Sequence, residues 1–185
     1  SGHVRIFQNN NNTWQQIGDD IDGEAAEDLS SESVSLSSDG SIVAISSINN
    51  NGNGNNSGHV RIFQNINNTW QQIGQDIEGE AAEDRSGGDI SLSSDGAIIA
   101  IGASSNDGNG DNSGHVRIFQ NINNTWQQIG EDIDGEATGD YSGSSVTLSS
   151  DGSIIAIGAY FNDGNGDRSG HVRIFQNNNN TWQQI

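Results

Sequence analysis

The sequence contains no cysteine, no lysine and no methionine. Without cysteine, no disulfide framework can form and thiol redox chemistry is excluded. Without lysine, 25 acidic side chains are balanced by only six arginines, and the formal net charge is −19 at pH 7. Such a surface repels nucleic acid, whose binding needs a basic footprint, and it disfavours anionic membranes. It favours cations, cationic partners and a salty environment.

Long apolar runs are also missing. No stretch approaches the roughly 18 to 20 residues of a membrane span, so no membrane insertion is expected. Hydrophobic residues make up only 30% of the chain, which raises disorder as an alternative. The apolar residues nevertheless fall in short β-branched runs at one phase of a repeat, a register that a disordered chain has no reason to keep.

The repeat is the dominant feature of the sequence. The octapeptide Ser1–Gln8 returns at Ser57, Ser113 and Ser169, with a constant spacing of 56 residues. A fixed period of this length predicts units that bury their apolar faces against their neighbours. The segment 169–185 copies 1–17 without a change, and no methionine stands at position 1, so we expect a processed or excised window of a longer array.

Each period predicts four short strands. His3–Gln8 alternates polar and apolar residues, and Thr13–Ile17 supplies a second strand of the same hairpin. Ser33–Ser37 alternates again, Asp39-Gly40 is a strong turn signal, and the apolar run Ser41–Ile45 follows. The acidic, glycine-rich stretch between the two hairpins is interpreted as a loop.

Four antiparallel strands per period is the plan of a β-propeller blade. A β-solenoid is the rival, but its coils usually take far fewer residues. We therefore predict an all-β protein of tandem four-stranded antiparallel propeller-type blades, with three full blades and a half-blade. The predicted units are an outer hairpin of an incomplete blade at 1–17, followed by a loop and a blade in each of 18–73, 74–129 and 130–185.

The order of motifs resembles two known repeats. Val34–Gly40, Ile42–Ile45 and Gly58–Phe63 look like the inner three strands of a WD-repeat blade. Tyr141–Val146, Ile157–Tyr160 and Gly170–Phe175 resemble the FG-GAP repeat of integrin α-subunit propellers. The resemblance covers every repeat, and it implies an FG-GAP-like protein of the kind found in long secreted or surface proteins of bacteria.

Two departures qualify the resemblance. The calcium loop of the FG-GAP family is shortened to Ser38-Asp39-Gly40, so that site does not carry over. The Trp-Asp pair that ends a WD-repeat strand is replaced by Phe63-Gln64.

Three and a half blades cannot close a propeller ring, which needs about four to eight blades. Further repeats of the same chain, a second copy or growth into a fibre would have to cover the exposed edges.

The propeller topology predicts where the charge lies. The inter-blade loops and the Asn/Gly loops emerge on one rim, which would gather 22 of the 25 acids there. The opposite rim carries Asn-rich turns, and the N-glycosylation acceptor pattern occurs at Asn11, Asn67, Asn123 and Asn179, with a further match at Asn55. In an Asn-rich chain such matches also arise by chance.

Two Asn/Gly loops have a spacing that can direct alternate oxygen atoms at a hard cation. The predicted Ca²⁺ ligands are Asp107, Asn109 and Asp111 in one loop and Asp163, Asn165 and Asp167 in the next. The bidentate acid of an EF-hand loop is missing, because Ile118 and Ile174 stand at its position. Two interpretations stay open: a flexible acidic turn with incidental cation binding, which the sequence favours, and a weak Ca²⁺ site. No other cofactor is expected.

Two aromatic residue types recur once per repeat. The histidines His3, His59, His115 and His171 are interpreted as strand-surface residues beside arginine, since copies on successive blades should lie too far apart to share a metal. The tryptophans Trp14, Trp70, Trp126 and Trp182 are interpreted as packing between blades, with a ligand-stacking ladder as the alternative.

No residue set points to catalysis, because every blade carries the same side chains and no apolar pocket is predicted around the carboxylates. We expect a secreted or cell-surface structural or adhesive protein whose blades self-associate into a scaffold or fibre, and not an enzyme. The alternative is a Ca²⁺-assisted propeller module that binds a surface protein or a glycan.

Overall fold

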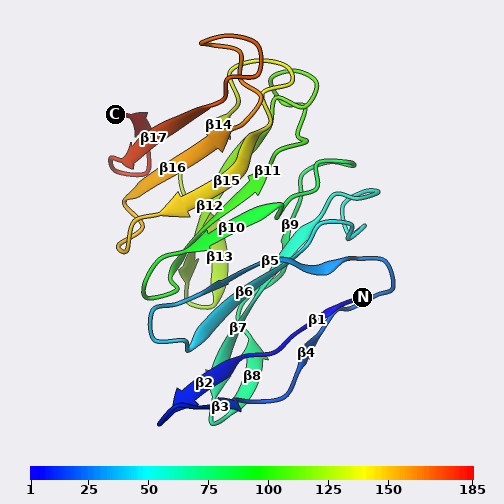
Figure 1. The fold of residues 1–185 in the computed structure, drawn as a ribbon, viewed down its shortest axis with the longest axis vertical. Helices are drawn as coiled ribbons and strands as arrows, with labels where there is room; N and C mark the ends of the chain where they lie inside the picture. The colour runs from blue at the N-terminus through cyan, green and yellow to red at the C-terminus, as the bar shows by residue number, and fades with distance from the viewer.

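The repeats form a stack of antiparallel β-sheets that runs along the long axis of the molecule (Figure 1). The computed structural model describes residues 1–185. It contains no helix that could cross a membrane. The first unit, at the N-terminal end, consists of two two-stranded pairings: β1 (His3–Val4) with β4 (Ile21–Asp22), and β2 (Phe7–Asn10) with β3 (Thr13–Gln16).

Three sheets with the same order follow. The first holds β5 (Ser30–Leu36), β6 (Ile42–Ser47), β7 (His59–Ile66) and β8 (Thr69–Gln72), and β9 (Ile77–Glu78) also pairs with β7. The second holds β10 (Asp89–Leu92), β11 (Ile98–Ala103), β12 (His115–Ile122) and β13 (Thr125–Gln128), and β14 (Ile133–Asp134) pairs with β12. The third holds β15 (Ser142–Leu148), β16 (Ile154–Ala159), β17 (His171–Asn177) and β18 (Trp182–Gln184). The predicted all-β class with four-stranded antiparallel blades is confirmed.

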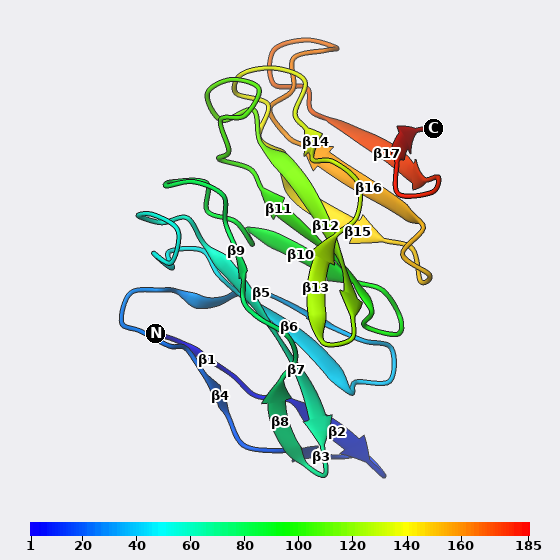
Figure 2. The ribbon, with the colours of Figure 1, turned by 180° about the vertical axis from the view of Figure 1, so that it is seen from behind.

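The third strand of the first two blades, β7 or β12, is buried on both sides, because it is enclosed by the units before and after it (Figure 2). Val60 and Ile62 point toward the next blade and join Ile90 and Leu92 in one apolar cluster. His59 and Arg61, in alternate positions, face the preceding unit. The period-2 pattern of a strand thus supplies two interfaces, and each blade needs both neighbours to bury its side chains.

Serine side chains connect the inner strands of adjacent blades. Leu92 N–H donates to Ser35 Oγ at 3.0 Å, and Leu148 N–H donates to Ser91 Oγ at 3.0 Å. The inner strand is the edge of its sheet, so these backbone groups have no ladder partner. Serine on the preceding blade supplies one, which explains why serine alternates with apolar residues there.

The Asn-rich turns are tighter than the sequence indicated. Ile66 pairs directly with Thr69, so only Asn67 and Asn68 form the loop. Their φ angles are 52° and 65°, as a two-residue type I′ hairpin requires. Asparagine tolerates this left-handed region, and the same pair recurs in every repeat.

The acidic stretch between hairpins is not only a rim loop. Glu78 pairs with His59 and Ile77 pairs with Val60, so the chain returns along the outer edge of its own blade. Asp22 and Asp134 occupy the same position in other units. The prediction that 22 acids lie on one rim was therefore wrong in part, because this return segment places several of them beside the third strand.

Candidate functional site

Two of the three interfaces between successive units bring a histidine to two acids. His59 lies at the start of β7, Glu24 comes from the connection of the preceding unit, and Asp76 comes from the return segment of the same blade. His59 Nε2 is 4.0 Å from a Glu24 oxygen, and His59 Nδ1 is 3.8 Å from an Asp76 oxygen. These three residues form cluster 1.

The next interface repeats the arrangement. His115 Nδ1 lies 3.8 Å from Glu80 Oε2 and 3.7 Å from Asp132 Oδ2. Glu80, His115 and Asp132 form cluster 2. In both clusters one ligand-type atom from each residue lies within 4.8 Å of the other two. The stacking of blades thus produces the same three-residue arrangement twice.

The two histidines are buried, contrary to the expectation of surface histidines. His59 is 1% exposed and His115 is 2% exposed. Burial lowers the pKa of His59 despite the nearby Asp76 and Glu24 carboxylates. Burial, together with the Arg117 guanidinium, lowers the pKa of His115. The expectation failed because β7 and β12 have a blade on each side, whereas the sequence pattern indicated a single covered face.

An arginine orients the glutamate of each cluster. Arg61 Nη1 lies 3.5 Å from Glu24 Oε1, and Arg61 Nη2 donates to Asp22 O at 2.8 Å. Arg61 also lies over the Phe63 ring at 5.3 Å. Arg117 has equivalent partners in Glu80, Glu78 and Phe119, and burial lowers its pKa.

The outermost histidines have fewer partners. His3 is exposed and lies 4.0 Å from Asp20 only. His171 lies 3.5 Å from Glu136, with no second acid beside it. A complete cluster therefore needs two neighbours of the histidine: the connection of the preceding unit, which supplies the glutamate, and the return segment of its own blade, which supplies the aspartate.

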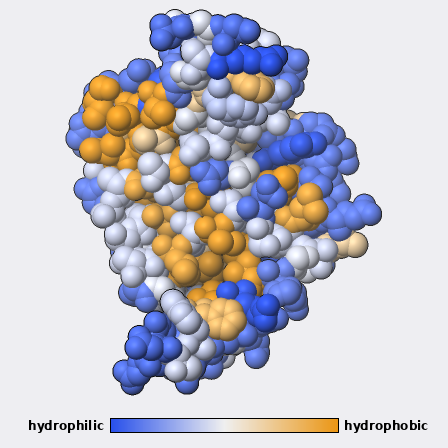
Figure 3. Space-filling view, viewed as in Figure 1, coloured by the Kyte–Doolittle hydropathy of each residue, from blue (hydrophilic) through white to orange (hydrophobic).

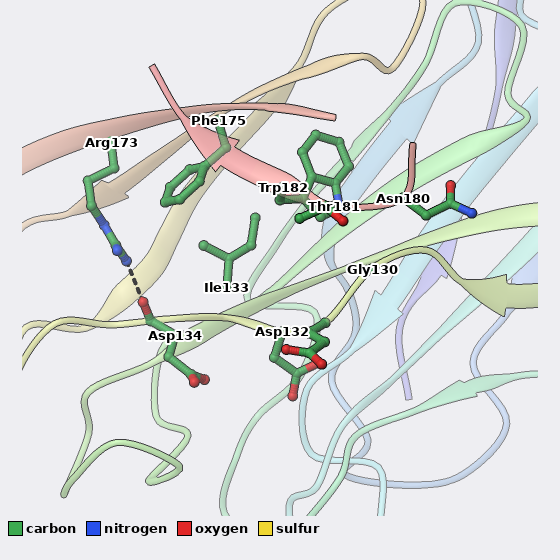
Figure 4. A pocket seen from close by; sticks show the side chains of 10 residues that line it. Gly130, Asp132, Ile133, Asp134, Arg173, Phe175, Asn180, Thr181 and Trp182 are labelled. Atoms are coloured by element: carbon green, nitrogen blue, oxygen red, sulfur yellow. Dashed lines mark hydrogen bonds between the residues drawn. The ribbon is translucent and has the colours of Figure 1, made fainter. Parts of the chain in front are cut away.

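A groove lies beside the arginine at two interfaces. Between the second and third blades it has a cavity volume of about 480 Å³ and is lined by Asp132, Asp134, Arg173, Phe175 and Trp182 among others (Figure 4). Arg173 reaches across it to the Asp134 carbonyl. The equivalent groove at the first interface, beside Arg61 and Trp70, measures about 280 Å³.

At the middle interface, between the first and second blades, Gln75 lies beside the tryptophan. Its side chain donates to Trp126 O at 2.9 Å and accepts from Trp126 N–H at 3.3 Å. Asp19 and Glu131 stand at the equivalent place in the other repeats and make no such contact with Trp70 or Trp182. In one repeat an amide bonded to the tryptophan backbone thus stands where the other two repeats have an acid beside the groove.

The predicted calcium loops lie against the neighbouring connection. Asn109 donates its side-chain amide to Gly135 O and Glu136 O, and Asp107 accepts from Asn112 N–H at 2.7 Å. Asp163 accepts from Arg168 N–H at 2.7 Å. The exposed Asp111, Asn165 and Asp167 complete the two sets. Asp111 also accepts from the Asn112 side-chain amide at 3.3 Å, so four of the six side chains make hydrogen bonds that hold the loops in place. Calcium binding stays a prediction.

The remaining predicted residues have distinct positions. The sequon residues Asn11, Asn67, Asn123 and Asn179 are exposed at hairpin turns, whereas the Asn55 side chain donates to Glu83 at 2.5 Å. The indole N–H groups of Trp70, Trp126 and Trp182 donate to backbone carbonyls of the preceding unit, at 2.9, 2.9 and 3.0 Å. Trp14, in the first unit of the structure, is 66% exposed.

The acids that face the histidines were not predicted from the sequence. Glu24, Glu80 and Glu136 recur at one phase of the repeat, and so do Asp20, Asp76 and Asp132, with no substitution. Nearby acids vary: Asp22 and Asp134 are replaced by Glu78. The invariance of these two acidic positions could have indicated a shared role. The glutamate and the aspartate that meet at one histidine lie far apart along the chain, so the sequence alone does not show that they meet.

Comparison with known proteins supports a repeat assignment. Residues 133–175 match the FG-GAP repeat family. No curated protein matches the chain. The chain is similar to a crystal structure of a protein from Bacteroides uniformis, provisionally assigned as a 6-phosphogluconolactonase, with a TM-score of 0.66 and 16% identity. A second such protein, from Bacteroides fragilis, gives a TM-score of 0.56 and 16% identity.

These structural neighbours show the fold alone, because their identity to the chain is low. The alignments cover 99% and 82% of this chain but only 47% and 36% of the two neighbours. The chain therefore spans about half the length of the first neighbour. The activity assigned to those proteins is not evidence of an activity here.

Proposed function

Because this chain is an FG-GAP-like repeat protein, we propose that it is a structural module whose end blades stack onto further blades of the same kind. The assembly would be an extracellular or cell-surface scaffold. The observation that carries the proposal is the apolar surface on both end faces of the stack. No catalytic role is proposed, since an FG-GAP repeat suggests a non-enzymatic module.

The face at β17 is apolar and exposed. Val172 is 66% exposed and Ile174 is 42% exposed. Their counterparts in the first two blades, Val60, Val116, Ile62 and Ile118, are all fully buried. The same side chains that form an interface twice inside the molecule are thus left uncovered at its end, and burying them would be favourable.

The opposite face carries the complementary residues. Val34 and Leu36 on β5 are about half exposed, whereas their counterparts Ile90 and Leu92 are buried against Val60 and Ile62. Figure 3 shows apolar surface over β17 and a larger apolar area over β5 and β6. Ile6 of the first unit, the counterpart of Ile174, already packs on Val43 and Ile45, so only the part of this face at Val34 and Leu36 is left open. A contact between the β17 face of one copy and Val34 and Leu36 of another would continue the stacking of units that the fold makes internally. Such a head-to-tail contact propagates rather than closes.

The test is the assembly state of the purified chain at about 0.15 M salt. We expect the average mass from sedimentation equilibrium to rise with protein concentration. The variant Val172→Asp/Ile174→Asp should remain monomeric, because it places charge in the stacking face. Ile122→Asp is the matched control, since Ile122 is 42% exposed but lies at a hairpin end. A wild-type chain that stays monomeric at millimolar concentration contradicts the proposal.

The proposal includes a location outside the cell or on its surface. The acidic surface and the four exposed sequon turns support this location. Partners would be further copies of the chain, and surface proteins or glycans would be secondary ones. Antibody labelling of intact source cells tests the location: labelling only after permeabilisation would contradict it.

A further inference from the structure

The two Glu–His–Asp clusters between blades have no role in the stacking function. Cluster 1 is Glu24, His59 and Asp76, and cluster 2 is Glu80, His115 and Asp132. We propose that each cluster binds one divalent transition-metal ion of the Zn²⁺ class, so that metal ions join successive blades. The site is independent of the end faces and of the Asn/Gly loops predicted to bind calcium.

The donor set suits zinc better than calcium. An imidazole nitrogen and two carboxylate oxygens are common zinc ligands, whereas calcium takes oxygen ligands only. Zinc–ligand bonds of about 2.0 to 2.2 Å place tetrahedral ligands about 3.3 to 3.6 Å apart. In cluster 2 a single nitrogen, His115 Nδ1, lies 3.8 and 3.7 Å from the two acids, which is close to that spacing. In cluster 1 Glu24 faces Nε2 and Asp76 faces Nδ1, and one ligand atom from each residue lies within 4.8 Å of the other two. One ion in cluster 1 therefore uses one of these nitrogens, and the acid on the other side has to move toward it.

These distances are too long for hydrogen bonds. In cluster 1, His59 Nε2 is buried and has no hydrogen-bond partner, although it faces the Glu24 carboxylate. A buried polar atom without a partner is uncommon in a folded protein and calls for an explanation such as a missing ion. A cation bound between His59 Nε2 and the Glu24 carboxylate supplies that partner.

The surroundings prepare both clusters for a metal. Arg61 and Arg117 each lie near the second oxygen of their glutamate, at 3.5 and 3.6 Å, and this contact turns the free oxygen toward the histidine. The arginine also adds positive charge, which the two carboxylates of each cluster outweigh. The net charge of −19 raises the local concentration of cations around the whole chain.

The repeat itself predicts the number of ions. His171 has Glu136 but no second acid, and His3 has Asp20 but no glutamate. Only the two interior clusters hold all three ligands. We therefore expect two ions per chain of 185 residues, although the chain has four histidines.

The experiment is a calorimetric titration of the metal-stripped full chain with ZnCl₂. The expected stoichiometry is two for wild type, one for Glu24→Gln, one for Glu80→Gln and none for the double variant. The changed side chains are 44% and 42% exposed, so the folded state should persist, and circular dichroism checks it. Glu136→Gln is the matched control and should still bind two ions.

A second readout separates a built site from loose binding to a charged surface. Zinc should raise the melting temperature of wild type and of Glu136→Gln but not of the double variant, and a hundredfold excess of Ca²⁺ should leave the zinc titration unchanged. No zinc binding, or an equal loss in Glu136→Gln, overturns the proposal. Repeating the titration on Val172→Asp/Ile174→Asp shows whether binding depends on stacking between copies, so the two proposals can fail separately.

Discussion

At the scale of residues, serine donors set the acidity of the aspartates in the tight turns of the blades. Asp39 in the turn between β5 and β6 accepts from Ser37 Oγ at 2.7 Å and from Ser41 N–H at 2.9 Å. The Ser41 backbone N–H, followed by the Ser37 and Ser41 hydroxyls, lowers the pKa of Asp39 to about 2. Asp151 in the third blade has the same kind of partners, led by Ser149, and its pKa is also about 2.

Changing Ser41 to Ala should raise the pKa of Asp39 toward the ordinary value of 3.8, because one donor to the carboxylate is lost. Since the folded-state pKa is below the unfolded one, this carboxylate contributes stability that is complete above about pH 3.8 and is lost as the pH falls through about 2. Carboxyl carbon shifts from NMR titration report both aspartates. Asp151 is the internal control and should keep its pKa of about 2 in Ser41→Ala. A wild-type Asp39 that titrates near 3.8 would contradict this prediction.

At the scale of elements, the outer strand holds adjacent units together through its tryptophan. The Trp126 indole N–H donates to Ile73 O, and the ring lies so close to Gly74 that a Cβ there would be 2.7 Å from it. Gly74 has a φ of 75°, which also favours glycine. The same glycine–tryptophan contact recurs at Gly18 and Trp70.

Trp126→Phe should lower the free energy of unfolding by about 0.5 to 1.5 kcal/mol, the net value of one hydrogen bond, with a further loss from packing. Trp14→Phe is the matched control: the same substitution at a position that is two-thirds exposed should change the free energy little. Urea denaturation with an unchanged m value measures both. Equal losses in the two variants would show that the contact with the preceding unit is not what stabilises the protein.

At the scale of the whole molecule, charge opposes compactness. The chain carries a formal charge of −19, and acids lie along the outer edges of the blades as well as at the loops. Like charges so arranged repel one another and destabilise the folded state. Salt shortens the range of this repulsion to about 10 Å at 0.1 M and about 3 Å at 1 M.

The melting temperature should therefore rise as NaCl is increased from 0.01 to 0.5 M, because the screening length of the repulsion falls from about 30 Å to a few ångström. A variant with Glu27→Gln and Asp167→Asn, both exposed positions, should show a smaller rise because less charge remains to be screened. Differential scanning calorimetry at low protein concentration measures the effect without assembly. A melting temperature that is independent of salt would mean that bound cations already neutralise the surface.

The amino-acid sequence by itself determined the repeat, the strand content and the blade plan. Alternation with period 2 and a spacing of 56 residues permit few other ways to bury the apolar side chains. Only the tertiary structure decided which polar residues meet. Glu24 and Asp76 belong to different periods, and they reach His59 because the chain returns along β7 at β9 while the connection of the preceding unit brings Glu24 to the same histidine. Contacts between neighbouring units depend on stacking and strand register, which are properties of the assembled sheets and not of any local stretch of the chain.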